Sequence, residues 1–143
     1  MINKGKNVWH HVHVGDLAKL YLLLGEAAVA GGPPATWDDQ GYYLAENGRF
    51  VWGEMLTAIT QEAQKQDLLP SAAMEQLEPS AALGRYTFSI GTDSQGQALR
   101  SRTLLGWMPE KTTANMYQEI LKIVESEAKT LGLIKGHAEK VAS

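Results

Sequence analysis

The hydrophobic pattern near the N-terminus predicts a strand that leads directly into a helix. Residues 8–14 are rich in β-branched and aromatic side chains, which favours a strand with alternating faces. One face would carry Val8, His10, Val12 and Val14, and the other Trp9, His11 and His13. Gly15 then ends the strand, and Asp16 is the expected N-cap of the helix.

The helix that follows is apolar around most of its circumference. Its inward stripe would consist of Leu17, Leu20, Tyr21, Leu24, Ala27 and Ala28. Leu22 and Leu23 widen this stripe, so we expect the helix to be covered on more than one side. Glycines and prolines at 31–34 end it.

The middle of the chain predicts a second strand, a turn and a second helix. Residues 41–46 favour a strand, and Asn47-Gly48 is a turn signal. A helix from Trp52 to about Asp67 is indicated by apolar residues at helical spacing, namely Trp52, Met55, Leu56, Ile59 and Ala63.

The last third predicts further helices and a polar tail. Residues 71–77 could form a short helix, and alternation over 86–90 could mark an extended piece. Asp93-Ser94 could cap a helix over 95–105. A final helix would begin after Thr112 or Thr113 and stop at Gly132, followed by a polar tail at 136–143. We therefore expect an α/β class, mostly helical with two or three short strands, in one portion spanning 1–135.

Composition excludes several classes of partner. A net charge of −3 gives no electrostatic reason to expect binding to nucleic acid or to an anionic membrane. No apolar run approaches the ~20 residues that span a bilayer, and no apolar run follows the polar N-terminus. The chain has no cysteine, which fits a reducing compartment. We expect a cytoplasmic protein.

Three of the four histidines lie at 10, 11 and 13, which raises the possibility of a metal site. In a strand only His11 and His13 share a face, and a structural zinc site needs four ligands. We therefore favour hydrogen-bonded histidines and no metal. Arg100 and Arg102 are of a type that binds phosphate or carboxylate, although a lone arginine is more often solvated.

No complete catalytic set is present in the sequence. The chain has no glycine-rich phosphate loop, no Tyr-x-x-x-Lys and no Gly-x-Ser-x-Gly. The carboxylates at 38, 39, 46 and 54 have no spacing that demands acid–base chemistry. We therefore predict no catalytic residue in this chain.

Three motifs in order resemble a known family. They are Val12-His-Val-Gly-Asp-Leu-Ala18, Gly41-Tyr-Tyr-Leu-Ala-Glu-Asn-Gly48 and Leu105-Gly-Trp-Met-Pro109. Together they resemble the C-terminal half of extended short-chain dehydrogenases/reductases, and more narrowly the fungal form of the NAD-dependent epimerase/dehydratase family. The resemblance covers roughly residues 4–131.

The resemblance implies a Rossmann-type NAD(P)-binding fold of which this chain is the C-terminal portion. The nucleotide-binding glycine turn and the catalytic Tyr-x-x-x-Lys of that family belong to its N-terminal half. We therefore expect a fragment that carries no cofactor alone, whereas NAD or NADP would serve the full-length enzyme. Residues 41–46 would belong to a parallel sheet whose other strands this chain lacks.

The family's substrate pocket maps onto a few positions of this chain. By resemblance, the pocket candidates are Trp9, His11, His13, Asp93, Ser94 and Arg100. Close relatives have Asn-Ser-Arg where this chain has Asp93-Ser94-Gln95, so an anion-binding arginine is absent there. Gly15 also replaces an aspartate, and Val51 stands where a serine often caps the next helix.

Two functions follow as expectations. The first is the substrate-binding part of an NAD(P)-dependent epimerase/dehydratase-like oxidoreductase, which takes a small-molecule substrate and is inactive alone. The second is a stand-alone interaction module that dimerises or binds a partner through an exposed apolar face. A third and weaker hypothesis is a histidine-based metal binder.

Overall fold

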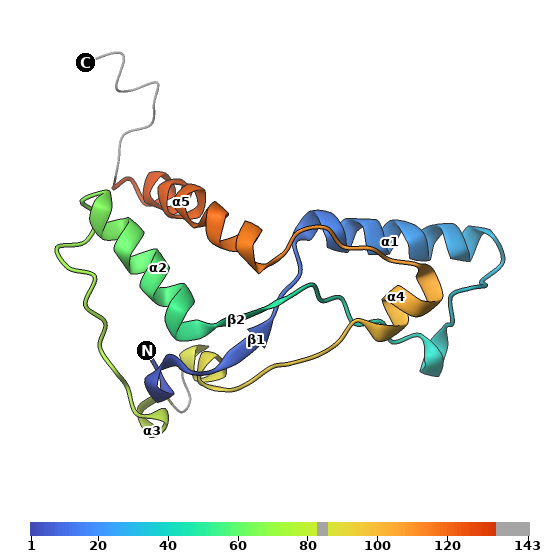
Figure 1. Ribbon diagram of the computed structural model, residues 1–143, viewed down its shortest axis with the longest axis horizontal. Coiled ribbons are helices and arrows are strands. Elements are labelled where there is room, and N and C mark those ends of the chain that lie inside the picture. The colour runs from blue at the N-terminus through green and yellow to red at the C-terminus, as the bar shows by residue number, and fades with distance from the viewer. Residues whose placement is uncertain (83–85, 134–143) are drawn as a thin grey trace, which may run out of the picture. The chain divides into compact units, whose positions relative to one another are not determined.

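The computed structural model describes residues 1–82 and 86–133 (Figure 1). Two short strands, β1 (Val8–His10) and β2 (Arg49–Val51), form a two-stranded sheet. The helices are α1 (Val14–Val29), α2 (Trp52–Lys65), α3 (Pro79–Ala82), α4 (Leu99–Leu105) and α5 (Thr113–Thr130). Short 3-10 helices lie at Asn3–Gly5, Asp38–Gln40 and Tyr86–Gly91. The mixed helix and strand content agrees with the expected α/β class.

The chain divides into two compact units, which are described separately. The first, called the α1–α4 unit, consists of residues 8–50 and 92–116. The second, called the α2–α5 unit, consists of residues 1–7, 51–91 and, among the described residues, 117–133. The expected tail at 136–143 lies outside the described residues.

The core of the α1–α4 unit forms where α1 packs against α4. Its buried residues are Leu20, Ala27, Ala35, Ala98, Leu105 and Trp107. Two backbone hydrogen bonds next to the sheet show that its strands are antiparallel. The His11 amide donates to the Gly48 carbonyl at 3.1 Å, and the Asn47 amide donates to the His11 carbonyl at 2.8 Å. The unit thus joins a helical core to a short strand pair.

The α2–α5 unit has its own core between two amphipathic helices. Ala63 of α2 and Ile120 and Val124 of α5 are buried together. Partly buried residues surround them, namely Met55, Ala58, Ile59, Leu68 and Tyr117. The helical periodicity of α2 and α5 in the sequence is therefore confirmed.

Several predicted elements differ in the structure. Residues 41–46 form no strand, because side chains of α4 bind their carbonyl groups in place of a neighbouring strand. The Ser101 hydroxyl donates to the Leu44 carbonyl at 2.6 Å, and the Arg102 guanidinium donates to the Glu46 carbonyl at 2.8 Å. The turn expected at Asn47-Gly48 is also absent, because the backbone of these two residues pairs with His11. The strand β2 begins directly after them, at Arg49.

The expected helix starts at Asp16 and at Asp93-Ser94 are also wrong. His13 caps α1, and Asp16 lies inside its first turn. α4 begins only at Leu99, because Asp93 and Ser94 bind the backbone of β1 instead. Residues 71–77 contain no helix, and 86–91 form a 3-10 helix rather than an extended piece.

None of the described helices combines the length and the apolar character that crossing a bilayer requires.

Candidate functional site

The structure places three of the predicted pocket residues side by side along β1. Residues 92–94 run parallel to this strand, with a bridge between Trp9 and Ser94. The Val8 amide donates to Asp93 Oδ1 at 2.7 Å, and Trp9 Nε1 donates to the Thr92 carbonyl at 2.8 Å. Trp9, Asp93 and Ser94 therefore form one cluster, here called the β1 cluster, although they are more than 80 positions apart in the sequence.

His10 also belongs to the β1 cluster, and sequence reasoning did not select it. Its Nδ1 lies 2.9 Å from the Ser94 carbonyl and 3.1 Å from the Gly96 amide. The strand alternation had placed His10 on the apolar face, so no signal in the sequence distinguished it from a core residue. In the structure it fixes the path of residues 94–96.

His11 is held by a threonine from the start of α5. Its Nε2 lies 2.8 Å from Thr113 Oγ1, and that hydroxyl donates to the Arg49 carbonyl at 2.9 Å. Because the hydroxyl hydrogen is used on Arg49, His11 Nε2 carries the hydrogen, and in the neutral ring Nδ1 is left as the acceptor. Burial lowers the pKa of His11, although the negative charge of Glu46 partly opposes this. The lowered pKa therefore favours the neutral form of the His11 imidazole.

Gly48 makes the close approach of His11 and Thr113 possible. Its φ of +133° is a conformation that side-chain-bearing residues rarely adopt. A Cβ at this position would lie 2.5 Å from Thr113 Oγ1 and 2.8 Å from His11 Nε2. Gly48 is thus required by both the backbone conformation and the packing.

His13 does not join His11, although a continuous strand would have put them on one face. The strand ends at His10, and His13 Nδ1 accepts a hydrogen bond from the Gly15 amide at 3.0 Å. Among the described residues no three His, Asp or Glu side chains gather as a metal site would require. His137 lies outside the described residues.

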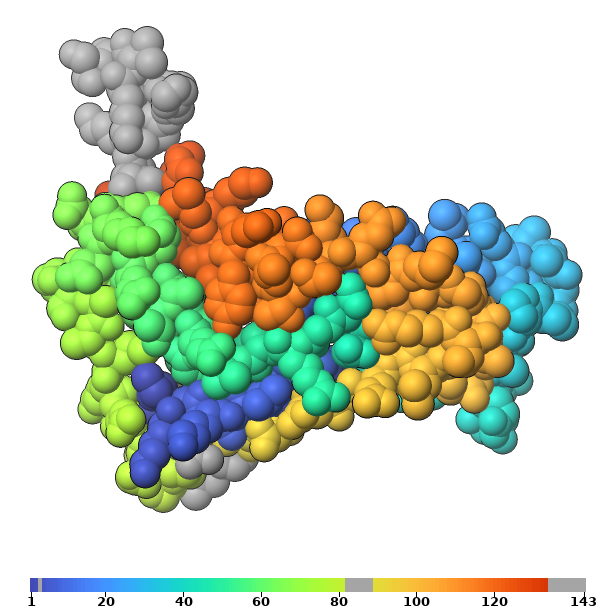
Figure 2. Space-filling model, viewed as in Figure 1, coloured from blue at the N-terminus to red at the C-terminus, as the bar shows by residue number. Residues whose placement is uncertain are grey.

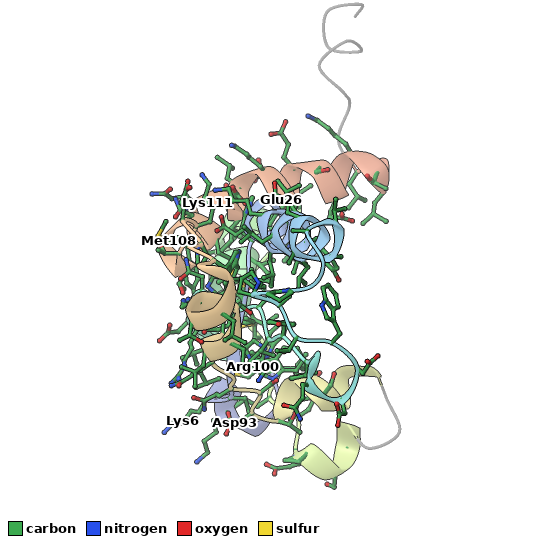
Figure 3. All side chains as sticks on the ribbon, turned by 90° about the vertical axis from the view of Figure 1, so that its right-hand side faces the viewer. Lys6, Glu26, Asp93, Arg100, Met108 and Lys111 are labelled. Carbon is green, nitrogen blue, oxygen red and sulfur yellow. The ribbon has the colours of Figure 1, made fainter. Side chains whose placement is uncertain are left out.

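Arg100 binds the loop at 36–43 rather than the β1 cluster (Figure 3). Its Nη2 donates to Thr36 Oγ1 and to the Gln40 carbonyl, and its guanidinium lies 5.5 Å from the centre of the Tyr43 ring. The Tyr43 hydroxyl accepts from the Thr36 amide at 2.7 Å. Burial alone would raise the pKa of Tyr43, but hydrogen bonds from Thr36 and the charge of Arg100 outweigh it and lower the pKa.

Glu46 and Arg102, which the sequence suggested only separately, form an ion pair. The Glu46 carboxylate lies 3.1 Å from Arg102 Nη1 and also accepts from the amides of Ala98 and Gly48. Burial alone would raise the pKa of Glu46, but these bonds outweigh it and hold the pKa below its usual range. Arg102 is thus occupied internally and is not a free anion-binding group.

The described residues line several surface hollows, of which three have the following positions. In the α2–α5 unit a hollow of about 520 Å³ is lined by residues that include Lys4, Lys6 and Glu54. In the α1–α4 unit one of about 440 Å³ lies beside Arg102 and Met108, and one of about 290 Å³ lies between α1 and residues 41–45. None of these three hollows is lined by the predicted pocket residues Trp9, His11, His13, Asp93, Ser94 or Arg100.

The two places where a strand enters a helix do not fit a dinucleotide. At the start of α1 the buried Asp16 carboxylate occupies the first turn, where a pyrophosphate would meet a like charge. At the start of α2 a Cβ on Gly53 would lie 2.7 Å from the Gly5 carbonyl oxygen, so backbone already covers that turn. Neither turn therefore provides an open phosphate cradle.

Comparison with known proteins relates this chain to part of an oxidase. No family model matches the chain, and no solved structure matches it. It is 29% identical over 142 residues to the oxidase ucsJ of Acremonium sp. The match covers 92% of this chain but only 40% of the oxidase. The chain thus has an oxidoreductase-like relative.

Proposed function

We propose that this chain is the substrate-binding part of an NAD(P)-dependent epimerase/dehydratase-like oxidoreductase and binds no nucleotide by itself. The observation that carries the proposal is the similarity to an oxidase of which this chain spans 40%. The order of the three sequence motifs supports the same assignment. The poor fit of a dinucleotide to the starts of α1 and α2 supports the proposal that the chain binds no nucleotide by itself.

The β1 cluster is the proposed substrate-binding surface. It combines the aromatic ring of Trp9 with the Asp93 carboxylate, and His11 follows directly on the strand as a neutral acceptor. An apolar ring flanked by a few oriented polar groups is the usual composition of a small-molecule site. In this proposal the chain binds and orients a hydroxy- or oxo-compound, and NAD or NADP bound elsewhere would supply hydride transfer.

Isothermal titration with NADH and NADPH tests the nucleotide half of the proposal. We expect no saturable heat from the 143-residue chain, because neither strand-to-helix turn is open to a pyrophosphate. Saturable micromolar binding of either nucleotide would contradict the proposal.

Amide chemical shifts test the substrate half. We expect members of a library of small hydroxy- and oxo-compounds to shift the amides of residues 8–13 and 92–96. Trp9→Ala should weaken that binding at least about tenfold, which corresponds to 1.4 kcal/mol. The matched control is Trp37→Ala, which removes a partly exposed tryptophan from the loop at 36–43. Equal loss in both variants would refute a site at β1.

A further inference from the structure

One face of α1 is apolar and exposed to solvent along the whole helix. Val14 is 74% exposed, Tyr21 68%, Leu22 62% and Val29 92%. The exposed small residues Ala18, Gly25 and Ala28 fill the gaps between them. At 3.6 residues per turn these seven positions, here called the α1 stripe, fall within about 120° of the helix circumference. Figure 2 shows the light-blue C-terminal half of α1 at the surface.

The charged residues of α1 lie outside this stripe. Asp16 is buried on the opposite side of the helix, and Lys19 is paired with Glu110 at 2.7 Å. Glu26, labelled in Figure 3, lies beyond the edge of the stripe at helical spacing. The occupant of the stripe therefore needs no complementary charge, and an apolar surface fits it.

The order of side-chain sizes along the α1 stripe reads the same in both directions. Residue pairs whose numbers add up to 43 belong to the same size class: the valines Val14 and Val29, the small residues Ala18 and Gly25, and the large residues Tyr21 and Leu22. Gly15 is likewise exposed and pairs with Ala28. Two antiparallel copies of a helix related by a two-fold axis bring such pairs opposite each other. A self-complementary patch is the requirement of a two-fold interface.

We propose that the α1 stripe binds the α1 stripe of a second copy of this chain, antiparallel, with the two-fold axis between Tyr21 and Leu22. The large central side chains pack across the axis, the small residues beside them let the helices approach, and the valines close the two ends. A crossing angle of about 20°, as in most helical bundles, keeps both ends in contact.

The surface beside the stripe extends the interface. Tyr21 also lines the hollow of about 290 Å³ between α1 and residues 41–45, and the neighbouring Tyr42 is 74% exposed. A single helical stripe is smaller than the ~800 Å² per partner of a standard interface. We therefore expect a dimer with micromolar rather than nanomolar affinity.

Sedimentation equilibrium of the full chain from about 5 to 500 μM tests whether a second copy of the chain binds the α1 stripe. We expect the weight-average mass to rise from that of one chain to that of two. Leu22→Glu places a carboxylate opposite the partner's Tyr21 and should weaken association at least about 30-fold, or about 2 kcal/mol. The matched control, Leu121→Glu on α5, changes another exposed leucine and should associate like the wild type.

Engineered cysteines test the register, since the natural chain has none. Ala18→Cys mixed with Gly25→Cys should form a disulfide between the two variants under mild oxidation. Neither variant alone should crosslink with itself at the same rate. Gly25 accepts the change because a Cβ there meets nothing within 4 Å. Self-crosslinking of Ala18→Cys above the mixed rate would indicate a parallel pair and refute the proposed register.

Two results would overturn the proposal as a whole. A chain that stays monomeric at 500 μM would mean that the stripe faces another protein surface. A dimer that Leu22→Glu leaves unchanged would place the interface elsewhere. The inference does not rest on the proposed function, because sedimentation and nucleotide titration measure independent properties.

Discussion

At the scale of single residues, Asp16 is a buried carboxylate of the α1–α4 unit whose hydrogen bonds reach a distant segment of the chain. It is 2% exposed, and its Oδ2 accepts from the amides of Glu110 and Lys111 at 3.0 and 2.7 Å. Its backbone carbonyl accepts from Trp107 Nε1 at 2.8 Å. Burial alone would raise the pKa of Asp16, but the two amides together with Lys19 outweigh it and lower the pKa. This residue therefore connects α1 to the segment that follows α4.

Asp16→Ala should lower the free energy of unfolding at pH 7 by about 2–3 kcal/mol, because it leaves two amides without their acceptor. In the wild type the folded pKa lies below the unfolded value of about 3.9, so the stabilisation is present above that pH and is lost as the pH falls through the folded pKa. The variant should therefore lose less stability than the wild type between pH 5 and 2. Urea denaturation across this pH range measures both effects.

The control for this prediction is Asp39→Ala, which removes an exposed carboxylate in the 38–40 turn. Its effect should stay within about 0.5 kcal/mol. If the two variants are equally stable, the Asp16 bonds contribute nothing to folding.

At the scale of elements, α4 is held by side-chain bonds to the 44–47 segment. It has seven residues, and a helix of that length is unstable alone. Ser101 and Arg102 bind the carbonyls of Leu44 and Glu46, and Gly106 ends the helix with φ +62°. Arg102 also lies over the Trp107 ring at 5.6 Å. The helix and the segment therefore stabilise each other.

Arg102→Lys should destabilise the protein by about 1–2 kcal/mol, because an ammonium group cannot bind the Glu46 carboxylate and carbonyl with a planar fork. Amide hydrogen exchange in residues 99–105 should become faster in the same variant. The matched control is Arg49→Lys on β2, which changes an exposed arginine and should alter stability by less than about 0.5 kcal/mol. Equal effects in the two variants would show that stability does not depend on the planar guanidinium of Arg102.

At the scale of the whole molecule, the described residues form two hydrophobic cores. Leu20 and Trp107 are buried in the α1–α4 unit, and Ile120 and Val124 in the α2–α5 unit. The two sets share no buried residue. We therefore expect each core to contribute its own packing energy and each unit to open independently.

Ile120→Ala should cost about 2–5 kcal/mol, since it leaves a cavity in the α2–α5 core. The resulting increase in amide exchange should be confined to α2 and α5, while the amides of α1 and α4 keep wild-type protection. Leu20→Ala should show the reverse pattern. A uniform increase over all residues in either variant would mean that the two cores unfold as one unit.

Local interactions determined much of what the sequence predicted correctly. Helical spacing of apolar residues located α1, α2 and α5, because a helix is stabilised by contacts within a few positions. The end of α4 at Leu105 was also predicted, because it depends on the left-handed conformation of one glycine, Gly106. The candidate residues Trp9, Asp93 and Ser94 were selected by resemblance alone.

The tertiary structure decided every feature that depends on pairing between distant residues. Residues 41–46 have the composition of a strand, but α4 satisfies their carbonyls, so no ladder forms. Aspartate is common at helix N-caps, but the Asp16 carboxylate is bound by amides nearly 100 positions away. Sequence by itself thus located the long helices α1, α2 and α5, because their energies are local. The partners of Asp16, Glu46 and the β1 cluster depended on which segments folding brings together.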